Sequence, residues 1–419
     1  MKRLSLPLAV AVVGGLAVSA AVVANDDEAG AVPAAATAPS TPSMPAPTGP
    51  EKVGKIDLHL VDKDRDEPWP AQAKPGKREL MVSVYYPAAA TAGHKRAPYM
   101  TSAIAKTADQ FITRGEFGLA SGAVNWTGIL TNAHLGAPME RGKHPVLVYS
   151  TEHLRMRNYG TAQAEDLASH GYIVVTTEST HEAFGVEFPG GRVEPIRLAP
   201  GSPNPPDAKK MTKVRVDDLR FVIDRLADLD AGRNPDHGKR ALPAGTRGAF
   251  DLRRTGVYGH VGGSVPGLEL TRTDRRVKAV AGLTDLVGTE KDDWSPIVHT
   301  GVKKPYMLLS TTELNADDEI GNRVADAGWR AFWPKLTGWK LNVQLQSSRW
   351  HALGDYIWLT HRVPGIERRD ALVGTVRPDR ALRSQNAFLN AFFDRHLRGR
   401  DDRVLHRASP AHPDITYLP

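Results

Sequence analysis

The sequence predicts an α/β fold in which a mostly parallel sheet is covered by helices on both faces. Short, nearly continuous apolar runs such as 144–150 are typical of strands buried on both sides. Segments with apolar residues at helical spacing, such as 219–226, alternate with these runs. A glycine-framed turn at 259–263 follows one strand and opens a helix. In such sheets the functional site lies beyond the carboxyl ends of the strands.

The expected elements alternate along the chain, without an internal repeat. Strands are predicted at 79–86, 144–150, 172–177, 255–258, 277–283, 305–309 and 341–345, and helices at 162–170, 219–226, 264–270 and about 384–397. We expect the strands that end near Ser150, Thr177, Tyr258 and Asp285 to be neighbours in one parallel sheet.

Composition describes an ordinary globular protein with enough material for a large core. Of 419 residues, 41% are hydrophobic and 24% are charged, and the formal net charge is +7. Basic residues are dispersed among acidic ones, so nucleic-acid binding gains little support. Peripheral contact with a membrane or cell wall stays open. The chain has no cysteine, so a disulfide framework is excluded.

The first fifty residues predict export. Residues 1–24 combine two basic residues, an apolar run and a small-residue cleavage site, which is typical of a signal peptide. The alternative is an uncleaved membrane anchor. Residues 25–50 are rich in Ala, Pro and Thr and predict a flexible linker. We therefore expect a secreted protein whose single folded domain spans 51–419.

The turn after the strand at 255–258 resembles a nucleophile elbow. Gly259 and Gly263 frame it, as in the G-x-S-x-G turn that lifts a serine out of the sheet of an α/β-hydrolase. The residue between them is Val261, which has no nucleophilic atom. Ser264, in the first turn of the next helix, is the alternative hydroxyl, but shifting the frame would place Pro266 at a glycine position.

Two later residues match the chain order nucleophile, acid, histidine. Asp285 follows the strand 277–283, where a carboxylate can orient an imidazole or merely cap a turn. His351 lies on the loop after the strand 341–345, where the catalytic base belongs. We expect Val261, Asp285 and His351 to converge at one edge of the sheet.

The chain resembles secreted actinobacterial esterase/lipase-like proteins related to platelet-activating factor acetylhydrolase. The resemblance runs from about residue 56 to the C-terminus, and its markers lie at 58–62, 78–87, 164–172, 187–192 and 391–399. It implies an α/β-hydrolase that cleaves acyl esters without a metal or organic cofactor. It also implies Asp285 as the acid, His351 as the base and Val261 at the nucleophile position.

The resemblance further implies an oxyanion hole made by the backbone N–H of Gly262 and by the loop after Ser150. That loop is glycine-rich in the family, but here it contains Glu152 and has His153 at the expected donor position. A carboxylate there would oppose the negative charge that an acyl transition state develops. Both departures indicate a site adapted to something other than ordinary acyl-enzyme chemistry.

Three functions follow. The first is a catalytically silent protein that binds a lipid, acyl or related small ligand. The second is an enzyme of altered mechanism in which His351, oriented by Asp285, activates water or moves a proton. The third is a hydrolase that uses Ser264. Because valine is strained at positive φ, we also expect the turn at Val261 to have relaxed.

Overall fold

The computed structural model describes residues 38–69, 76–198, 205–284, 287, 295–313, 327–401 and 403–418. Most of its strands form one sheet of eleven, in the order β13-β12-β11-β10-β9-β5-β6-β2-β1-β4-β3. Their bounds are β1 Lys52–Asp66, β2 Lys77–Ala88, β3 Arg96–Pro98, β4 Leu130–Leu135, β5 His144–Ser150, β6 Ile173–Thr177, β9 Phe250–His260, β10 Val277–Leu283, β11 Tyr306–Glu313, β12 Lys340–Arg349 and β13 Ile415–Leu418. A separate pair joins β7 (Gly185–Phe188) to β8 (Arg192–Pro195).

The centre of the sheet is parallel, as predicted. Strands β6, β5, β9, β10, β11 and β12 lie side by side and run in the same direction. The predicted neighbours ending near Ser150, Thr177 and Tyr258, and the strand before Asp285, are therefore adjacent. Their carboxyl ends meet at one edge. The long β1–β2 hairpin adds an antiparallel extension, which the sequence did not indicate as a pair.

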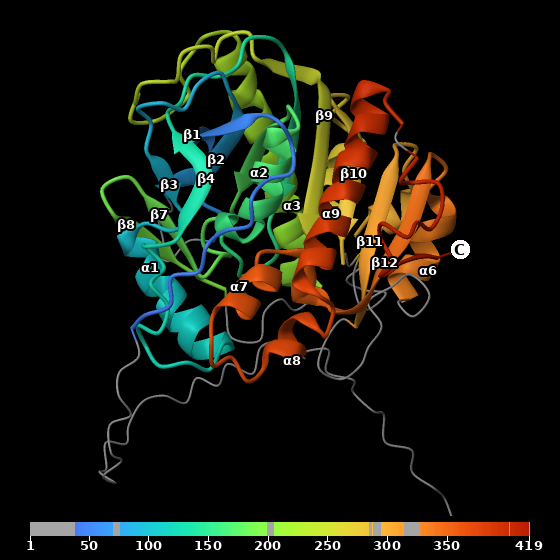
Figure 1. Ribbon diagram of the computed structural model, residues 1–419. Helices are drawn as coiled ribbons and strands as arrows, with labels where there is room; N and C mark the ends of the chain where they lie inside the picture. The colour runs from blue at the N-terminus through green and yellow to red at the C-terminus, as the bar shows by residue number, and fades with distance from the viewer. Residues whose placement is uncertain are drawn as a thin grey trace, which may run out of the picture.

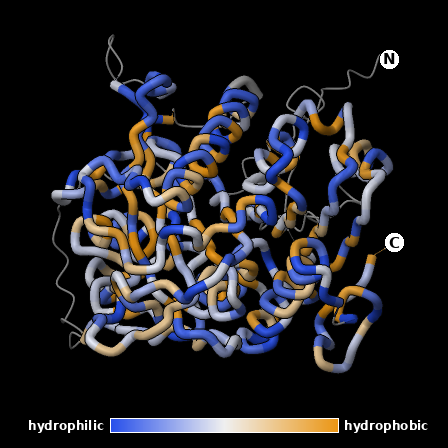
Figure 2. Tube along the Cα trace, turned by 90° about the horizontal axis from the view of Figure 1, so that it is seen from above, coloured by the Kyte–Doolittle hydropathy of each residue, from blue (hydrophilic) through white to orange (hydrophobic). Residues whose placement is uncertain are grey.

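Helices pack on both faces of the sheet (Figure 1). One face carries α2 (Thr161–Ser169), α7 (Tyr356–Arg362) and α9 (Pro378–Phe393), whose apolar residues share one core cluster. The other carries α3 (Pro205–Asp230), α4 (Val265–Leu270) and α6 (Ala327–Phe332), which share a second. Figure 2 shows hydrophobic segments concentrated inside the molecule, with hydrophilic ones toward the outside.

The remaining helical segments are short and lie near the carboxyl edge or on the periphery. They are α1 Ser102–Ala108, η1 Asp109–Glu116, η2 Arg157–Gly160, α5 Ile297–Thr300, η3 Trp333–Lys335, η4 Trp350–Leu353, α8 Arg369–Val373 and η5 Asp394–Arg398. Of these, η1, η2 and η4 supply side chains to the site below, namely Glu116, Tyr159 and His351.

The segment 38–50, which we expected to be a flexible linker, lies against the domain. Met44 is 7% exposed, and the backbone N–H of Thr48 donates to Asp166 at 2.8 Å. Ser40 forms a bridge to Val124. These contacts offset the ordering entropy of a proline-rich chain. We call residues 38–50 the strap. The predicted signal peptide at 1–24 lies outside the described residues.

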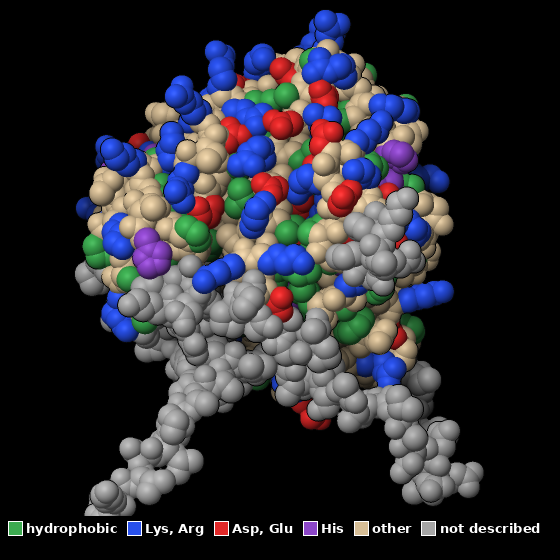
Figure 3. Space-filling model, turned by 180° about the vertical axis from the view of Figure 1, so that it is seen from behind, with side chains coloured by type: hydrophobic (Ala, Val, Ile, Leu, Met, Phe, Trp, Pro, Cys, Tyr) green, Lys and Arg blue, Asp and Glu red, His purple; other side chains and the backbone are tan. Residues whose placement is uncertain are grey.

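The surface mixes both signs of charge. On the face in Figure 3, Lys and Arg side chains are dispersed, with Asp and Glu between them. In the part of the chain that the structure describes, none of the helices combines the length and the apolar character needed to cross a bilayer.

Candidate active site

The turn after β9 is built as a tight elbow. A Cβ at Gly259 would lie 2.2 Å from the carbonyl carbon of Gly263, and a Cβ at Gly263 would lie 2.3 Å from the Ser150 carbonyl oxygen. Real side chains do not tolerate such approaches, so glycine is required at both positions. The elbow then enters α4. Packing therefore requires both glycines whether or not the turn carries a nucleophile.

Val261 has φ 40°, so the expectation that this turn had relaxed was wrong. A β-branched residue in this region is strained, at a cost of about 1–3 kcal/mol. The neighbouring contacts explain why the strain persists. The N–H of Val261 donates to the Leu283 carbonyl at 3.0 Å, and Gly263 is wedged against Ser150. The elbow is held from both adjacent strands.

Other left-handed residues gather at the same edge of the sheet. Leu154, His181, Thr284 and Ser347 have φ of 70°, 69°, 47° and 55°. Leu154 follows β5, His181 follows β6 and Thr284 follows β10, whereas Ser347 lies near the end of β12. Leu154 lies in the loop for which the resemblance implied a glycine-rich sequence. Leucine keeps a conformation that glycine adopts without strain.

His351 lies on η4 beside the elbow. The link between them is direct, since Nε2 of His260 donates to the carbonyl oxygen of Trp350 at 2.8 Å. Val261 thus contacts the end of β10, and the residue before it contacts the residue before His351. Asp285 lies outside the described residues, so its role as the acid stays a prediction.

The imidazole of His351 is surrounded by donors. A guanidinium nitrogen of Arg155 lies 3.2 Å from its Nε2, and the Trp350 indole nitrogen lies 2.7 Å from each ring nitrogen. Because a guanidinium only donates, Nε2 must be the acceptor in the bond with Arg155, whereas the indole lies equally close to both nitrogens and does not distinguish them. We therefore assign the proton to Nδ1, which donates to the Tyr159 hydroxyl oxygen at 3.0 Å.

The protonation of His351 is opposed by its surroundings. Burial lowers the pKa of His351 well below its ordinary value, and the positive charge of Arg155 and the nearby His260 lower it further. In this arrangement the Nε2 lone pair of the imidazole is engaged by the Arg155 guanidinium. That lone pair is the one a serine proton would need.

Arg155 is the centre of a buried charge cluster that the sequence did not reveal. Its Nη1 donates to Glu116 at 2.6 Å and to the Tyr356 hydroxyl at 3.1 Å. Tyr356 in turn donates to the other oxygen of Glu116. The guanidinium also lies over the rings of Tyr159, Phe184 and Tyr356. Only 7% of its side chain is exposed, and these partners hold it against His351.

Glu152 is paired with the elbow rather than with an oxyanion. Its carboxylate lies 3.0 Å from Nδ1 of His260, whose Nε2 donates to a carbonyl. Both ring nitrogens of His260 thus face acceptor oxygens, one of the Glu152 carboxylate and one of a backbone carbonyl. Glu152 also lies 3.6 Å from Nε of Arg155.

The remaining predicted site residues are His153, Gly262 and Ser264. Burial, followed by the charges of Arg215 and Arg155, lowers the pKa of His153 to about 3, so this side chain is neutral. Gly262 has φ 77° and follows Val261 in the turn. Ser264 is fully buried at the start of α4 and accepts a helical bond from Leu268.

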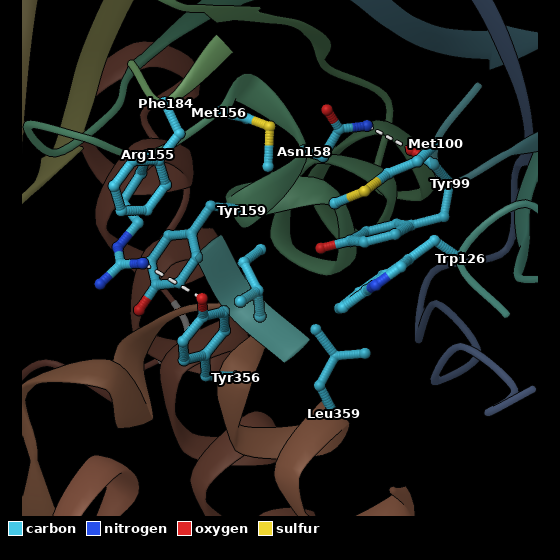
Figure 4. A pocket seen from close by; sticks show the side chains of 11 residues that line it. Tyr99, Met100, Trp126, Arg155, Met156, Asn158, Tyr159, Phe184, Tyr356 and Leu359 are labelled. Carbon is cyan, nitrogen blue, oxygen red and sulfur yellow. Dashed lines mark hydrogen bonds between the residues drawn. The ribbon is translucent and has the colours of Figure 1, made fainter. Parts of the chain in front are cut away.

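A hollow lies beside Arg155 and His351. It measures about 300 Å³ with the solvent that enters it, but its enclosed part has room for only about one water molecule. Figure 4 shows Arg155, Tyr159 and Tyr356 on one side and Tyr99 and Trp126 on the other. The remaining lining residues are Met100, Ile112, Met156, Asn158, Phe184 and Leu359. Arg155 is the only charged residue of the lining.

Among the residues that the structure describes, no three His, Asp or Glu side chains are grouped as a metal site requires. Sequence reasoning named Glu152 and His153 in the loop but missed Arg155, Tyr159, Tyr356 and Glu116. Arg155 stands two residues after His153, so its place in the rewritten loop was the available signal. Its partners come from distant segments that only the fold brings together.

A parallel sheet with helices on both faces and a strand–elbow–helix turn at its carboxyl edge define an α/β-hydrolase fold. No family model matches the chain. A solved structure, the ferulic acid esterase from Streptomyces cinnamoneus, is 32% identical with a TM-score of 0.71, and the match covers 91% of this chain and 100% of that one. The chain therefore belongs to the esterase family that includes this protein.

A second relative agrees with this assignment. A protein of Arthroderma benhamiae named as a probable 1-alkyl-2-acetylglycerophosphocholine esterase is 25% identical over 409 residues, which cover 92% of this chain and 96% of the relative. The expected kinship with esterases of the platelet-activating factor acetylhydrolase type is thus supported in its coarser form, as an esterase-like member of the α/β-hydrolases.

Proposed function

We propose that the chain is a non-catalytic member of its esterase family that binds a small acyl or lipid-type ligand beside the former catalytic centre. The observation that carries this is the contact between Arg155 and Nε2 of His351, at 3.2 Å. With Val261 at the elbow, the site lacks a nucleophile, and with Arg155 in place the base is occupied. Two of the parts that acyl transfer requires are lost together.

The ligand class rests on the relatives and on the lining of the hollow. The two relatives are named for esters of ferulic acid and of an acetylated glycerophosphocholine. The lining here is mostly aromatic and aliphatic, with Asn158 and Arg155 as the polar exceptions. Such surfaces bind apolar ligands and orient them through a few polar groups.

An enzyme of altered mechanism is the second candidate. It is favoured by the Glu152–His260 pair, which joins a carboxylate to an imidazole at 3.0 Å next to the elbow. In this mechanism, however, His351 would need Arg155 to withdraw before it could accept a proton. Activity would then depend on His351 and resist fluorophosphonates.

The decisive experiment combines fluorophosphonate labelling with a panel of esters, including p-nitrophenyl acetate, a short-acyl phospholipid and methyl ferulate. We expect neither labelling nor turnover above the background of a His351→Ala variant. Turnover that disappears in His351→Ala without labelling would replace our proposal with the altered mechanism. Covalent labelling would identify a surviving serine nucleophile, and Ser264→Ala would then test whether it is Ser264.

A further inference from the structure

We propose that the surface beneath the strap is a binding site for an extended, uncharged peptide, and that the chain's own residues 38–50 occupy it in cis. A segment of the same pattern on another protein chain would compete for this surface. The inference is independent of the ligand bound beside His351. It follows from how the strap is held, from which of its side chains are buried, and from how the surface beneath it is built.

The strap has no regular structure of its own. Residues 38–50 form no helix and no strand, and they are rich in proline, which has no backbone N–H to donate. Their order therefore comes from the surface that they contact. That surface is made by three separate segments, 123–132, α2 and α7, and the last two lie on one face of the sheet (Figure 1).

The backbone of the strap is held along its length by groups of the domain. Ser40 exchanges two backbone hydrogen bonds with the loop before β4, both at 2.8 Å. The carbonyl of Ser43 accepts from Arg362 of α7, and that of Pro45 accepts from the Asn132 amide at 2.8 Å. Main-chain bonds of this kind hold extended peptides in many recognition sites.

The carboxyl end of the strap has the most selective contacts. Thr48 donates to one carboxylate oxygen of Asp166 from both its N–H and its hydroxyl, each at 2.8 Å. The N–H of Gly49 donates to the Ser169 hydroxyl at 2.9 Å. A Cβ at Gly49 would lie 2.3 Å from the Ser169 carbonyl oxygen, so the surface excludes a side chain at this position.

The side chains of the strap alternate between the domain and the solvent. Pro42 and Met44 are buried, whereas Thr41 and Ser43 are exposed. Met44 reaches the core cluster that α2, α7 and α9 share. In sites that bind extended peptides, pockets for alternate side chains select the sequence. Pro42 and Met44 are therefore the positions that we expect to determine specificity, together with Gly49.

The groups that hold the strap are positioned by the domain itself. Asp166 also accepts from Asn390 of α9 at 2.8 Å, and the Asn132 amide also donates to Glu165 at 2.9 Å. The Ser169 hydroxyl donates to the Asp166 carbonyl at 2.6 Å. A surface built in advance binds a peptide without reorganising, and only the peptide loses conformational freedom.

The test supplies the strap as a separate peptide of residues 38–50, with blocked ends and a fluorescent label. Its binding to full-length proteins is measured by anisotropy. In the wild type the tethered strap competes at a local concentration of about 1 mM. Met44→Glu in the protein places a charge at an apolar position and so removes this competitor. We expect Met44→Glu to bind the peptide at least about tenfold more tightly than the wild type does.

Matched peptides and one further variant test whether the peptide occupies the strap's own position. A peptide with Gly49→Ala should bind Met44→Glu at least about tenfold more weakly, because its methyl group would meet Ser169. A peptide with Ala46→Ser, at an exposed position, should bind as the unchanged peptide does. Adding Arg362→Met to Met44→Glu removes one donor and should weaken binding about three- to tenfold.

A second protein variant, Gly49→Ala, displaces the tethered strap without altering the core. The proposal is overturned if neither Met44→Glu nor Gly49→Ala binds the peptide at concentrations up to about 1 mM. It is also overturned if the wild type binds as tightly as both variants, or if a scrambled peptide binds them equally well. Failure of both variants to unfold cooperatively in urea would overturn it too, since the surface would then depend on the strap.

Discussion

At the scale of single residues, restoring a hydroxyl at position 261 tests how the site diverged. Val261 retains the positive φ of a nucleophile position, so a serine there would have the required backbone conformation. Nε2 of His351, however, accepts from Arg155. We therefore expect Val261→Ser alone to hydrolyse p-nitrophenyl acetate at rates far below the roughly 1–10³ s⁻¹ of ordinary enzymes.

Releasing the base should matter more than restoring the hydroxyl. In Val261→Ser combined with Arg155→Met, Nε2 no longer accepts from a guanidinium, and we expect hydrolysis to rise about tenfold or more above the single variant. The matched control is Val261→Ala with Arg155→Met, which has the free base but no hydroxyl. If Val261→Ser alone reaches ordinary esterase rates, Arg155 does not block the base and the non-catalytic proposal is wrong.

The residues of the site were predictable only in part. The elbow and His351 could be found because chain order and glycine framing are local features. The prediction of a relaxed turn was wrong because contacts with Leu283 and Ser150, which belong to the two neighbouring strands, hold Val261 at positive φ. Arg155 was overlooked for a related reason. A lone arginine in a loop has no local pattern, and its partner Glu116 is 39 residues away in sequence.

At the scale of elements, the strap is the clearest test of sequence reasoning. A segment rich in Ala and Pro predicts disorder by composition, but Met44 is buried in the same core cluster as residues of α1, η1 and α7. We expect Met44→Ala to lower the free energy of unfolding by about 2 kcal/mol, since large-to-small changes at buried methionines have effects of this order. Ala46→Ser, at an exposed strap position, should have no measurable effect. Denaturant unfolding measures both. Equal midpoints for the two variants would show that the strap is detached in solution.

The sequence predicted the parallel strands at the centre of the sheet, but it did not predict the antiparallel pairing of β1 with β2. The parallel strands were recognisable because burial on both faces gives short continuous apolar runs. The β1–β2 hairpin has no such signature. In β1, Lys52–Asp66, charged residues interrupt the apolar ones, and some of them, such as Lys55 and Asp62, are buried. Its partner β2 follows after a segment outside the described residues. Register there depends on tertiary contacts.

At the scale of the whole molecule, buried carboxyls predict how stability depends on pH. Burial raises the pKa of Asp355 to about 8 and that of Glu165 to about 7. Both groups stay protonated in the folded chain at pH values where the unfolded chain has already released these protons. Each group therefore lowers the free energy of unfolding as pH rises from its unfolded pKa to its folded pKa, by up to about 1.4 kcal/mol per pH unit.

Histidines act in the opposite direction at lower pH. Burial lowers the pKa of His153 to about 3 and that of His396 to about 4, so stability is lost as pH falls below about 6.5, where the unfolded imidazoles take up protons. The two effects overlap between about pH 4 and 6.5 and partly cancel. Between about pH 6.5 and 8 the carboxyls act without this opposition, and the protein should become less stable.

The variant Asp355→Asn isolates this effect. Asp355 accepts from the backbone N–H groups of Thr161 and Ala162, at 3.2 and 3.1 Å, so asparagine will change the absolute stability of α2. The informative quantity is the slope of the unfolding free energy against pH, measured by urea unfolding at pH 6.5, 7, 8 and 9. We expect a shallower decline in Asp355→Asn than in the wild type, because the variant has no proton to lose, and an unchanged slope in the exposed control Glu367→Gln. Parallel profiles for the wild type and Asp355→Asn would mean that Asp355 is already ionised in the folded protein at neutral pH, and the start of α2 would then hold a buried negative charge stabilised by its two N–H donors.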